Sequence, residues 1–449
     1  MLTLAIAHGA CSVDAHTTRD DPRDGLTSEV APAPDAGVPH DLVQGTDAPS
    51  DGDLAGVGDL PESPDAETDP DTDAEDALDS APPDADPVFG PMQLVAATAG
   101  NSKTPVIAST GGALHVVWHD FTPRADGGAV PTLHHASRAS PEAAWSEPAL
   151  VLSEAGRNLF PTLAITTNHL DGHALHVAWQ REVDGVTTLM HASMPDADHP
   201  GSAAFTAASP VVRGTSPRLV VVGSRLHVVG FDGAALAHAS APAGTADASG
   251  FVPSAPWPLS DAFVNTLDLA AVPEAPNTAS FLVGFATSPG ETSYDVRRVR
   301  WSPGSGWGTR ETVFTSSGRS SDDLDAVAGP AGPAWVWTEQ DADTPEDIPV
   351  VALDPSHPRA EPIRVTREAG FAMSPTAARL PDGRLVVAWV TPRDTIAVSF
   401  GPDFKADLDL GGKKATFPDV TVAPDGAVHV VFSARDEAGI QQIWHAEAR

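Results

Sequence analysis

Seven copies of one apolar pattern fill the chain from Val88 to its C-terminus. Each copy has a strand led by proline or an aliphatic residue, and then an apolar strand that ends in tryptophan or phenylalanine, clearest at residues 114–118, 175–179, 385–389 and 428–432. The copies recur about every 40 to 57 residues with about four short strands each, which is typical of a β-propeller. The pattern therefore predicts an all-β, seven-bladed propeller, with six and eight blades as alternatives. It assigns no function, because propellers carry many unrelated activities.

The two ends of the repeat region predict how the ring closes. The seventh copy stops after its third strand, at Arg449, which would leave an unpaired edge. Residues 91–97 precede Asn101 in the way that the fourth-strand residues 148–152 precede Asn158. We therefore expect the N-terminal strand to complete the last blade.

The segment before the repeats has a different composition. Residues 12–87 contain 22 Asp or Glu, 11 prolines and only two basic residues, Arg19 and Arg23. Such a segment buries too little apolar surface to offset its conformational entropy. The sequence thus divides into a truncated signal with a lipobox at residues 1–11, a disordered Asp/Pro-rich tether at 12–87, and the propeller at 88–449.

Cys11 is the only cysteine, which excludes a disulfide within one chain and a thiolate metal cluster. Residues 7–12, Ala-His-Gly-Ala-Cys-Ser, resemble the lipobox of bacterial lipoproteins, although His8 stands where an aliphatic residue is usual and a basic segment is missing. The resemblance implies lipidation of Cys11 and an exported protein on the outer membrane or cell surface. A periplasmic or secreted protein with a cleaved signal, and a chance cysteine in a cytoplasmic protein, stay open.

The net charge of the chain limits the classes of molecule that it can bind. The formal charge is -35 at pH 7, and the repeat region is acidic as well as the tether. Acidic surfaces repel nucleic acid and anionic lipid. We expect no nucleic-acid partner, and membrane contact only through a lipid anchor.

Two turns carry a resemblance to a known family. Residues 302–307 and 140–145 each begin with serine and end with tryptophan, and the whole repeat resembles the sialidase-like (neuraminidase-like) propellers. That family often has an Asp-box at this turn, and here the aspartate is absent. The resemblance implies a glycoside hydrolase with a tyrosine nucleophile and three substrate-clamping arginines. The single tyrosine, Tyr294, has Arg297, Arg298 and Arg300 nearby, but neighbouring residues of one strand point to opposite faces. We therefore predict no catalytic residue.

Histidines recur at one position of the second strand and one of the third, and both positions change together in the remaining copies. Joint presence predicts that the two face each other across antiparallel strands. We expect structural imidazole pairs, while pH sensing stays a second possibility because buried pairs would have to charge in acid. No carboxylate or cysteine recurs nearby to complete a metal site, so we predict no metal and no cofactor. The pairs are His115 with His135, His176 with His191, His227 with His238, and His429 with His445.

Loops that lead into the first strands and leave the second strands share one face of a propeller, and loops on rigid scaffolds tend to carry binding residues. This face predicts ligand-binding residues Asp120, Arg157, Asn158, Arg181, Asp232, Arg319, Asp322, Glu339, Arg393 and Lys413. The leading hypothesis is a monomeric, non-enzymatic module at the cell surface that binds a glycan or an extracellular protein there. A glycoside hydrolase of sialidase-like fold and a structural or assembly scaffold are the alternatives.

Overall fold

The structure is a computed structural model, and it describes residues 86–449 except 124–128, 152–155, 168–171, 202–203, 245–249, 260–262, 273–279, 289–293, 317–319, 341–343, 345 and 357–360. The predicted signal, Cys11 and nearly all of the predicted tether lie outside the described residues. Among the described elements, none is a helix long and apolar enough to cross a membrane.

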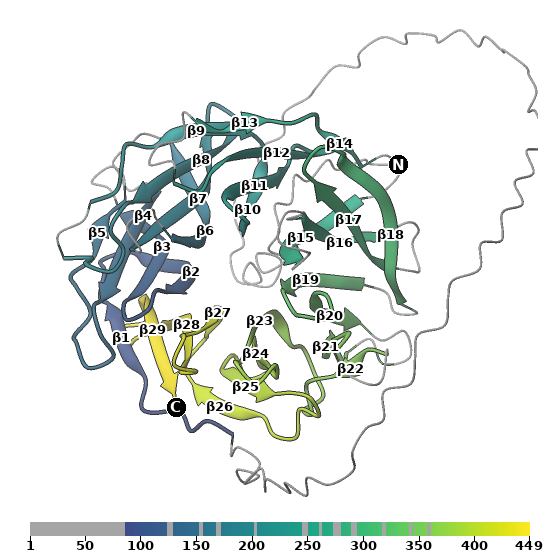
Figure 1. Cartoon of the computed structure of the whole chain (residues 1–449). Helices are drawn as coiled ribbons and strands as arrows, with labels where there is room; N and C mark the ends of the chain where they lie inside the picture. The colour runs from purple at the N-terminus through teal and green to yellow at the C-terminus, as the bar shows by residue number, and fades with distance from the viewer. Residues whose placement is uncertain are drawn as a thin grey trace, which may run out of the picture. The chain divides into compact units, whose positions relative to one another are not determined.

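The described strands form seven antiparallel sheets arranged as the blades of a ring, as predicted (Figure 1). In each blade the strand nearest the axis comes first in the sequence, except that the last blade takes its outer strand from the N-terminus. Blade 1 consists of β2 (Asn101–Ser109), β3 (Leu114–Pro123), β4 (Ala129–Arg138) and β5 (Ala149–Leu150). Blade 2 consists of β6 (Arg157–Thr167), β7 (His173–Val183), β8 (Val186–Met194) and β9 (Ser209–Arg213). Blade 3 consists of β10 (Thr215–Val222), β11 (Arg225–Phe231), β12 (Ala235–Pro242), β13 (Val252–Pro253) and β14 (Trp257–Pro258).

The remaining four blades follow the same order. Blade 4 consists of β15 (Phe263–Val272), β16 (Ser280–Ser288), β17 (Tyr294–Ser302) and β18 (Gly306–Ser316). Blade 5 consists of β19 (Ser320–Val327), β20 (Ala334–Gln340), β21 (Val350–Leu353) and β22 (Ile363–Arg364), and blade 6 of β23 (Met373–Arg379), β24 (Leu385–Val390), β25 (Ile396–Phe400) and β26 (Leu408–Gly411). Blade 7 consists of β27 (Thr416–Val422), β28 (Val428–Arg435), β29 (Gln441–Ala448) and β1 (Gln93–Ala96).

The N-terminal strand closes the ring, which confirms the predicted closure. β1 pairs antiparallel with β29, with Gln93 opposite His445 and Leu94 opposite Trp444. The amide of Gly90 also donates to the carbonyl of Glu447 at 2.8 Å. Blade 7 is thus held together by both ends of the repeat region, and its outer edge is paired rather than open.

The apolar core lies between neighbouring blades. Among the described residues, seven hydrophobic clusters each join the facing sides of two adjacent blades. The aromatic residue at the end of the second strand is buried in several blades, as with Trp118, Trp179 and Phe432 at 0 % exposure. The repeated aromatic residue lies in five of these seven clusters, and burial of such side chains stabilises the ring.

The fourth strands differ most from the sequence prediction. In blade 1 the strand is only Ala149–Leu150, shorter than the predicted residues 148–152, whereas in blade 4 it runs from Gly306 to Ser316. The turn that resembles an Asp-box is therefore a tight hairpin at residues 303–305, and Trp307 lies in the strand opposite Trp301.

Candidate functional site

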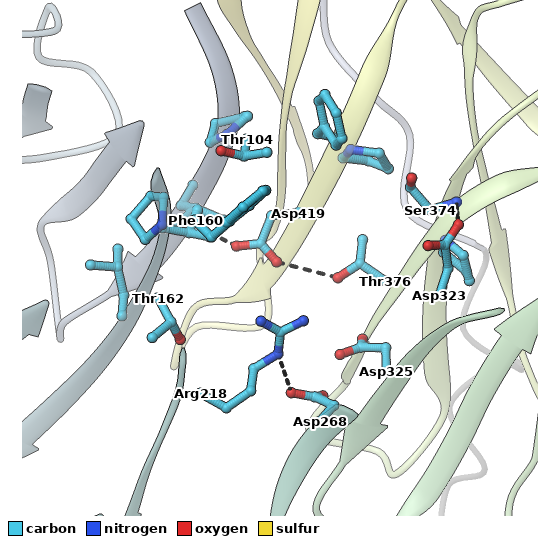
Figure 2. Close-up of a pocket in the computed structure, with 18 of the residues that line it drawn as sticks. Thr104, Phe160, Thr162, Arg218, Asp268, Asp323, Asp325, Ser374, Thr376 and Asp419 are labelled. Atoms are coloured by element: carbon cyan, nitrogen blue, oxygen red, sulfur yellow. Dashed lines mark hydrogen bonds and ion pairs between the residues drawn. The ribbon is translucent and has the colours of Figure 1, made fainter. Parts of the chain in front are cut away.

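A cavity of about 330 Å³ lies at the axis of the ring and is lined by the first strands of all seven blades (Figure 2). Its size falls in the range of small-ligand pockets. The lining includes four aspartates, one arginine, two phenylalanines and several hydroxyl groups: Thr104, Phe160, Thr162, Ser216, Arg218, Asp268, Asp323, Asp325, Ser374, Thr376, Phe417 and Asp419. The cavity thus combines aromatic surface with many hydrogen-bonding groups.

A repeated bulge in the first strands positions this lining. In six blades the residue before the strand-leading proline or leucine has a positive φ of 45 to 52°: Thr104, Phe160, Ser216, Asp323, Ser374 and Phe417. The strand register shifts at the same point, for example between Lys103 and Val106 and between Thr416 and Asp419. A β-bulge of this kind re-aims side chains. All six of these residues line the cavity.

The aspartates of the cavity bind the neighbouring blade. Asp268 accepts a hydrogen bond from the amide of Ala326 at 2.7 Å, and Asp325 accepts one from the amide of Ala377 at 2.5 Å. Asp419 likewise accepts from the amide of Ile107 at 2.7 Å, which ties blade 7 to blade 1. These carboxylates are fixed acceptors, because each is held by a backbone group of the next blade.

The same carboxyls have unusual acidity. Burial raises the pKa of Asp419 to about 6, although hydrogen bonds from the Ile107 amide and the Thr376 hydroxyl oppose the rise. Burial also raises the pKa of Asp323. The pKa of Asp325 is raised well above its usual range, first by burial and then by the charge of Asp268, to which its carboxyl is hydrogen-bonded. Near pH 6 the carboxyl of Asp419 is therefore partly protonated.

Arg218 is the one cationic side chain among the residues that line the cavity. Its Nε lies 2.9 Å from Oδ1 of Asp268, so its charge is already neutralised (Figure 2). On the other side of the cavity, Thr376 donates to Asp419 at 3.2 Å. The lining is thus acidic overall and offers a ligand more acceptors than donors.

Two of the predicted rim residues are buried within the fold. Asp120, at 0 % exposure, accepts hydrogen bonds from Ser102 at 2.8 Å and Thr122 at 2.7 Å. Asn158, at 1 % exposure, accepts one from the indole of Trp179 at 2.9 Å. Their polar groups stabilise strand ends and do not line the cavity.

The other predicted rim residues are spread around the ring. Arg157 and Arg393 form ion pairs with Glu182 at 3.2 Å and Glu368 at 2.8 Å. Asp232 caps a turn by accepting the amide of Ala235 at 2.8 Å. Glu339 accepts a hydrogen bond from the indole of Trp337, Arg181 is half-buried, and Lys413 is exposed. Arg319 lies outside the described residues, and the side chain of Asp322 is not described. The structure brings none of the described members of this set into the cavity.

Each predicted histidine pair is hydrogen-bonded in the structure. The Nδ1···Nε2 distances are 3.1 Å for His115 with His135, 3.1 Å for His176 with His191, 3.0 Å for His227 with His238, and 3.2 Å for His429 with His445. The register differs from the expected one, because the partners are not directly opposite. In blade 1, for example, His115 lies opposite Ser137 and His135 opposite Val117, so the two rings meet diagonally.

The geometry of these pairs suits a hydrogen bond and not a metal. The ring planes lie within 9 to 23° of each other and the ring centres are 5.3 Å apart, so the rings meet nearly edge to edge. An N–H of one ring then points at the lone pair of the other. Glu447 lies near His429 and His445, but its carboxylate is already bound by Arg138 at 2.6 Å and Arg449 at 2.7 Å. These three residues do not fit a metal ion as they stand.

The arginines near Tyr294 do not form a clamp. Arg297 binds Asp295 at 2.6 Å, and Arg298 binds Glu311 at 2.8 Å. The side chain of Tyr294 is not described, and neither it nor these arginines are among the residues lining the cavity. A sialidase-type arrangement is therefore not assembled by the described residues of this strand.

The sequence contains a signal for the cavity that the repeat pattern alone does not reveal. Polar or aromatic residues flank the strand-leading residue in each copy, as in Phe160-Pro161-Thr162 and Phe417-Pro418-Asp419. The position after that residue holds Val106, Thr162, Arg218, Asp268, Asp325, Thr376 and Asp419 in the seven copies. Charged residues at an otherwise apolar strand position indicate a polar surface on the axis.

Comparison with known proteins gives a likeness in fold. No family model matches the chain, and no curated protein matches it either. A structure of unknown function from Dyadobacter fermentans has a TM-score of 0.47 at 11% identity, over 81% of this chain and 99% of that one. An α-L-arabinofuranosidase of Fusarium graminearum with arabinobiose has a TM-score of 0.46 at 11% identity, over 81% and 98%. A Trypanosoma rangeli sialidase has a TM-score of 0.40 at 10% identity, over 78% of this chain and 55% of that one.

Proposed function

We propose that this propeller is a non-catalytic recognition module that binds a glycan in the cavity at the ring axis. The observation that carries the proposal is the lining itself, in which Phe160 and Phe417 adjoin fixed carboxyl acceptors and hydroxyl groups of the first strands. Sugars offer apolar C–H faces to aromatic rings and hydroxyl donors to carboxylates, and charge-assisted hydrogen bonds are the stronger ones. The ligand site is thus deeper than the loop rim that the sequence suggests.

The charge of the cavity selects among glycans. Arg218 is paired with Asp268, so the lining offers a carboxylated sugar no free cation, and above about pH 6 the sugar would also meet the negative charge of Asp419. Like charges in a confined site repel strongly. We therefore propose a neutral glycan as the ligand, rather than a sialylated or otherwise anionic one.

A glycoside hydrolase is the second candidate. In its favour, Asp325 has a raised pKa and is hydrogen-bonded to Asp268, as a general acid beside a carboxylate would be. Against it, both carboxylates already accept backbone amides of the next blade, which gives them a structural role. An assembly scaffold, or a protein partner on the loop rim, would use the exposed rim and leave the cavity empty.

We propose that the protein acts outside the cell as a monomer, anchored through Cys11 with residues 12–87 as a spacer. The lipobox-like sequence and the acidic, proline-rich composition support this proposal. Mass spectrometry of the native N-terminus tests it: a diacylated cysteine supports anchoring, and an unmodified Met1 contradicts it.

The full chain on an array of neutral and acidic glycans tests the binding proposal. We expect retention of neutral glycans without release of sugar, and a loss of affinity of about tenfold or more in Phe417→Leu, which removes a flat ring from the cavity. The matched control is Arg393→Gln, since Arg393 lies on the rim in an exposed ion pair. Equal weakening by both variants, or weakening by the control alone, would favour the rim. Released sugar would favour the hydrolase.

A further inference from the structure

Four consecutive interfaces of the ring share a buried feature that is absent from the other three among the residues that the structure describes. Each histidine pair is covered by an aromatic residue that the next blade supplies between or within its third and fourth strands. The ring centres lie 5.2 Å apart for His135 and Phe205, 5.0 Å for His191 and Phe251, 5.6 Å for His238 and Trp307, and 5.3 Å for His445 and Trp145. These contacts span the interfaces of blades 1 and 2, 2 and 3, 3 and 4, and 7 and 1. We call them the histidine arc.

The histidine pairs also hydrogen-bond to the next blade. His115 donates to the carbonyl of Ala197 at 2.8 Å, which lies in the loop after β8. Thr166 contacts His176 at 2.9 Å and donates to the carbonyl of Ala243 in blade 3. The imidazoles are 0 to 5 % exposed. Protonation would therefore place a charge on a buried ring that packs against the next blade. It would also replace the acceptor nitrogen of the imidazole pair by a second donor.

Few charges face these pairs. Asp198 lies near His115, Arg225 near His227 and His238, and Glu447, Arg138, Asp425 and Arg449 near His429. In blade 2 the groups that act on His176 and His191 are the Ala243 carbonyl and the two imidazoles themselves. The charge of Glu447 favours the protonated form of His429, and the charge of Arg138 opposes it. These two opposing charges act on the histidine pair at the seam between blades 7 and 1.

Burial keeps the imidazoles neutral. It lowers the pKa of His115, His176, His238 and His429 to about 4, and that of His135, His191 and His227 to about 3. Burial also lowers the pKa of His445. Since these folded-state values lie below the ordinary value of about 6.5, the unfolded or opened state gains the proton first. Stability is fully present above pH 6.5 and falls as the pH drops toward 4.

We propose that the histidine arc is an acid-sensitive device: protonation parts blades 7, 1, 2, 3 and 4 along four adjacent interfaces, while the interfaces between blades 4 and 5, 5 and 6, and 6 and 7 stay closed. At the corresponding positions these three interfaces have no histidine pair: blade 4 has Leu282 with Arg298, blade 5 has Ala334 with Ala352, and blade 6 has Val386 with Val398. Trp335 and Trp337 pack with Leu282 between blades 4 and 5, and Val386 and Val398 pack between blades 6 and 7. Acid would therefore loosen a contiguous part of the ring and not the whole ring.

Hydrogen exchange of the full chain, measured at pH 7.5 and pH 5.0 and expressed as protection factors, tests this device. One histidine shifted from pKa 6.5 to about 4 makes opening about thirtyfold more favourable at pH 5, so we expect a loss of at least tenfold in protection. The loss should appear in β3, β7 and β11 of the histidine arc and be absent in β20 and β24. A uniform loss, a loss that begins in β20 and β24, or unchanged protection everywhere would overturn the proposal.

A double substitution sharpens the test. His176→Val with His191→Val copies the residues found at the same register in blade 6, Val386 and Val398. We expect it to abolish the acid response between blades 2 and 3 while the other three interfaces keep theirs. The control Val386→Ala with Val398→Ala should lower protection in blade 6 equally at both pH values. If the histidine variant does not fold, the wild-type exchange profile decides alone. None of the eight histidines lines the cavity, so failure here leaves glycan binding untouched.

Discussion

The histidine arc and the remaining apolar interfaces solve one packing problem in two ways. In both, the second and third strands of one blade press against the next blade. The histidine arc fills this space with hydrogen-bonded imidazoles covered by an aromatic edge, whereas the interface between blades 5 and 6 uses Val336, Ala352 and Trp389. The fold tolerates polar and apolar fillings because one nitrogen of each imidazole bonds its partner, although Nδ1 of His191 and of His445 has no hydrogen-bond partner. What differs is the response to acid and to changes in volume.

Removal of the closure strand should have the largest effect, because it opens the histidine arc at its seam. Deletion of residues 88–97 exposes the edge of β29 and removes Val95 and Ala96 from the cluster with Trp118. We expect the melting temperature to fall by about 10 °C or more, since the apolar surface that is no longer buried contributes several kcal/mol, roughly, to the free energy of unfolding. Deletion of ten residues within 12–87 is the control for calorimetry. An unchanged melting temperature would contradict the closure model.

The apolar interfaces should be sensitive to added volume. A Cβ on Gly284 would lie 2.1 Å from the ring of Trp335 in the next blade, so Gly284→Ala forces blades 4 and 5 apart. Overpacking of this kind costs about 1–3 kcal/mol. Gly112→Ala, where a Cβ meets nothing within 4 Å, is the control. Urea denaturation of both variants measures the difference, and equal stability would show that blade 4 shifts freely.

Within the histidine arc, a single hydrogen bond should matter less. The hydroxyl of Ser254 lies 2.7 Å from Nδ1 of His238. Ser254→Ala leaves this buried nitrogen without that partner, which costs about 1–2 kcal/mol. Thermal denaturation at pH 7.5 measures the loss. A cost below about 0.5 kcal/mol would show that an unpaired Nδ1 is tolerated here, as it is at His191 and His445.

The cavity carboxyls titrate in the direction opposite to the histidines. The folded-state pKa of Asp419 is raised to about 6, so its contribution is fully present below about pH 4 and is lost as the pH rises through 6. Asp419→Asn keeps an acceptor for the Ile107 amide without the charge. We expect the variant to gain about 2 kcal/mol relative to the wild type between pH 4.5 and pH 8. A difference in free energy of unfolding that does not change with pH would contradict the raised pKa.

The architecture could be predicted from the sequence because it depends on periodicity. The repeated second strand, the proline that leads the first strand and the fourth-strand-like segment at residues 91–97 define the blades and their closure. Lengths of the fourth strands could not be predicted, because outer strands such as β5 are short and partly exposed. The histidine pairing was visible as joint occurrence, but its diagonal register depends on where the hairpin turn falls.

The cavity was missed for a physical reason. Polar residues in predicted loops suggest a binding site, yet Asp120 and Asn158 lie buried in hydrogen-bond networks. The lining residues belong to strands, and it is the bulge before each leading residue that turns them toward the axis. Bulges leave little trace in an apolar pattern, so the position of Asp325 and Asp419 required the three-dimensional structure.

The six left-handed residues have a consequence for how the cavity can change. An L-residue with a side chain in this region costs about 1–2 kcal/mol relative to glycine, which adopts it without strain. Glycine stands at none of these six positions, where Thr104, Phe160, Ser216, Asp323, Ser374 and Phe417 occur instead. The ring therefore gives up stability to present side chains on its axis. A glycine at any one of them would ease the backbone but empty part of the lining, and at Asp323 it would also remove the acceptor of the Ser374 amide.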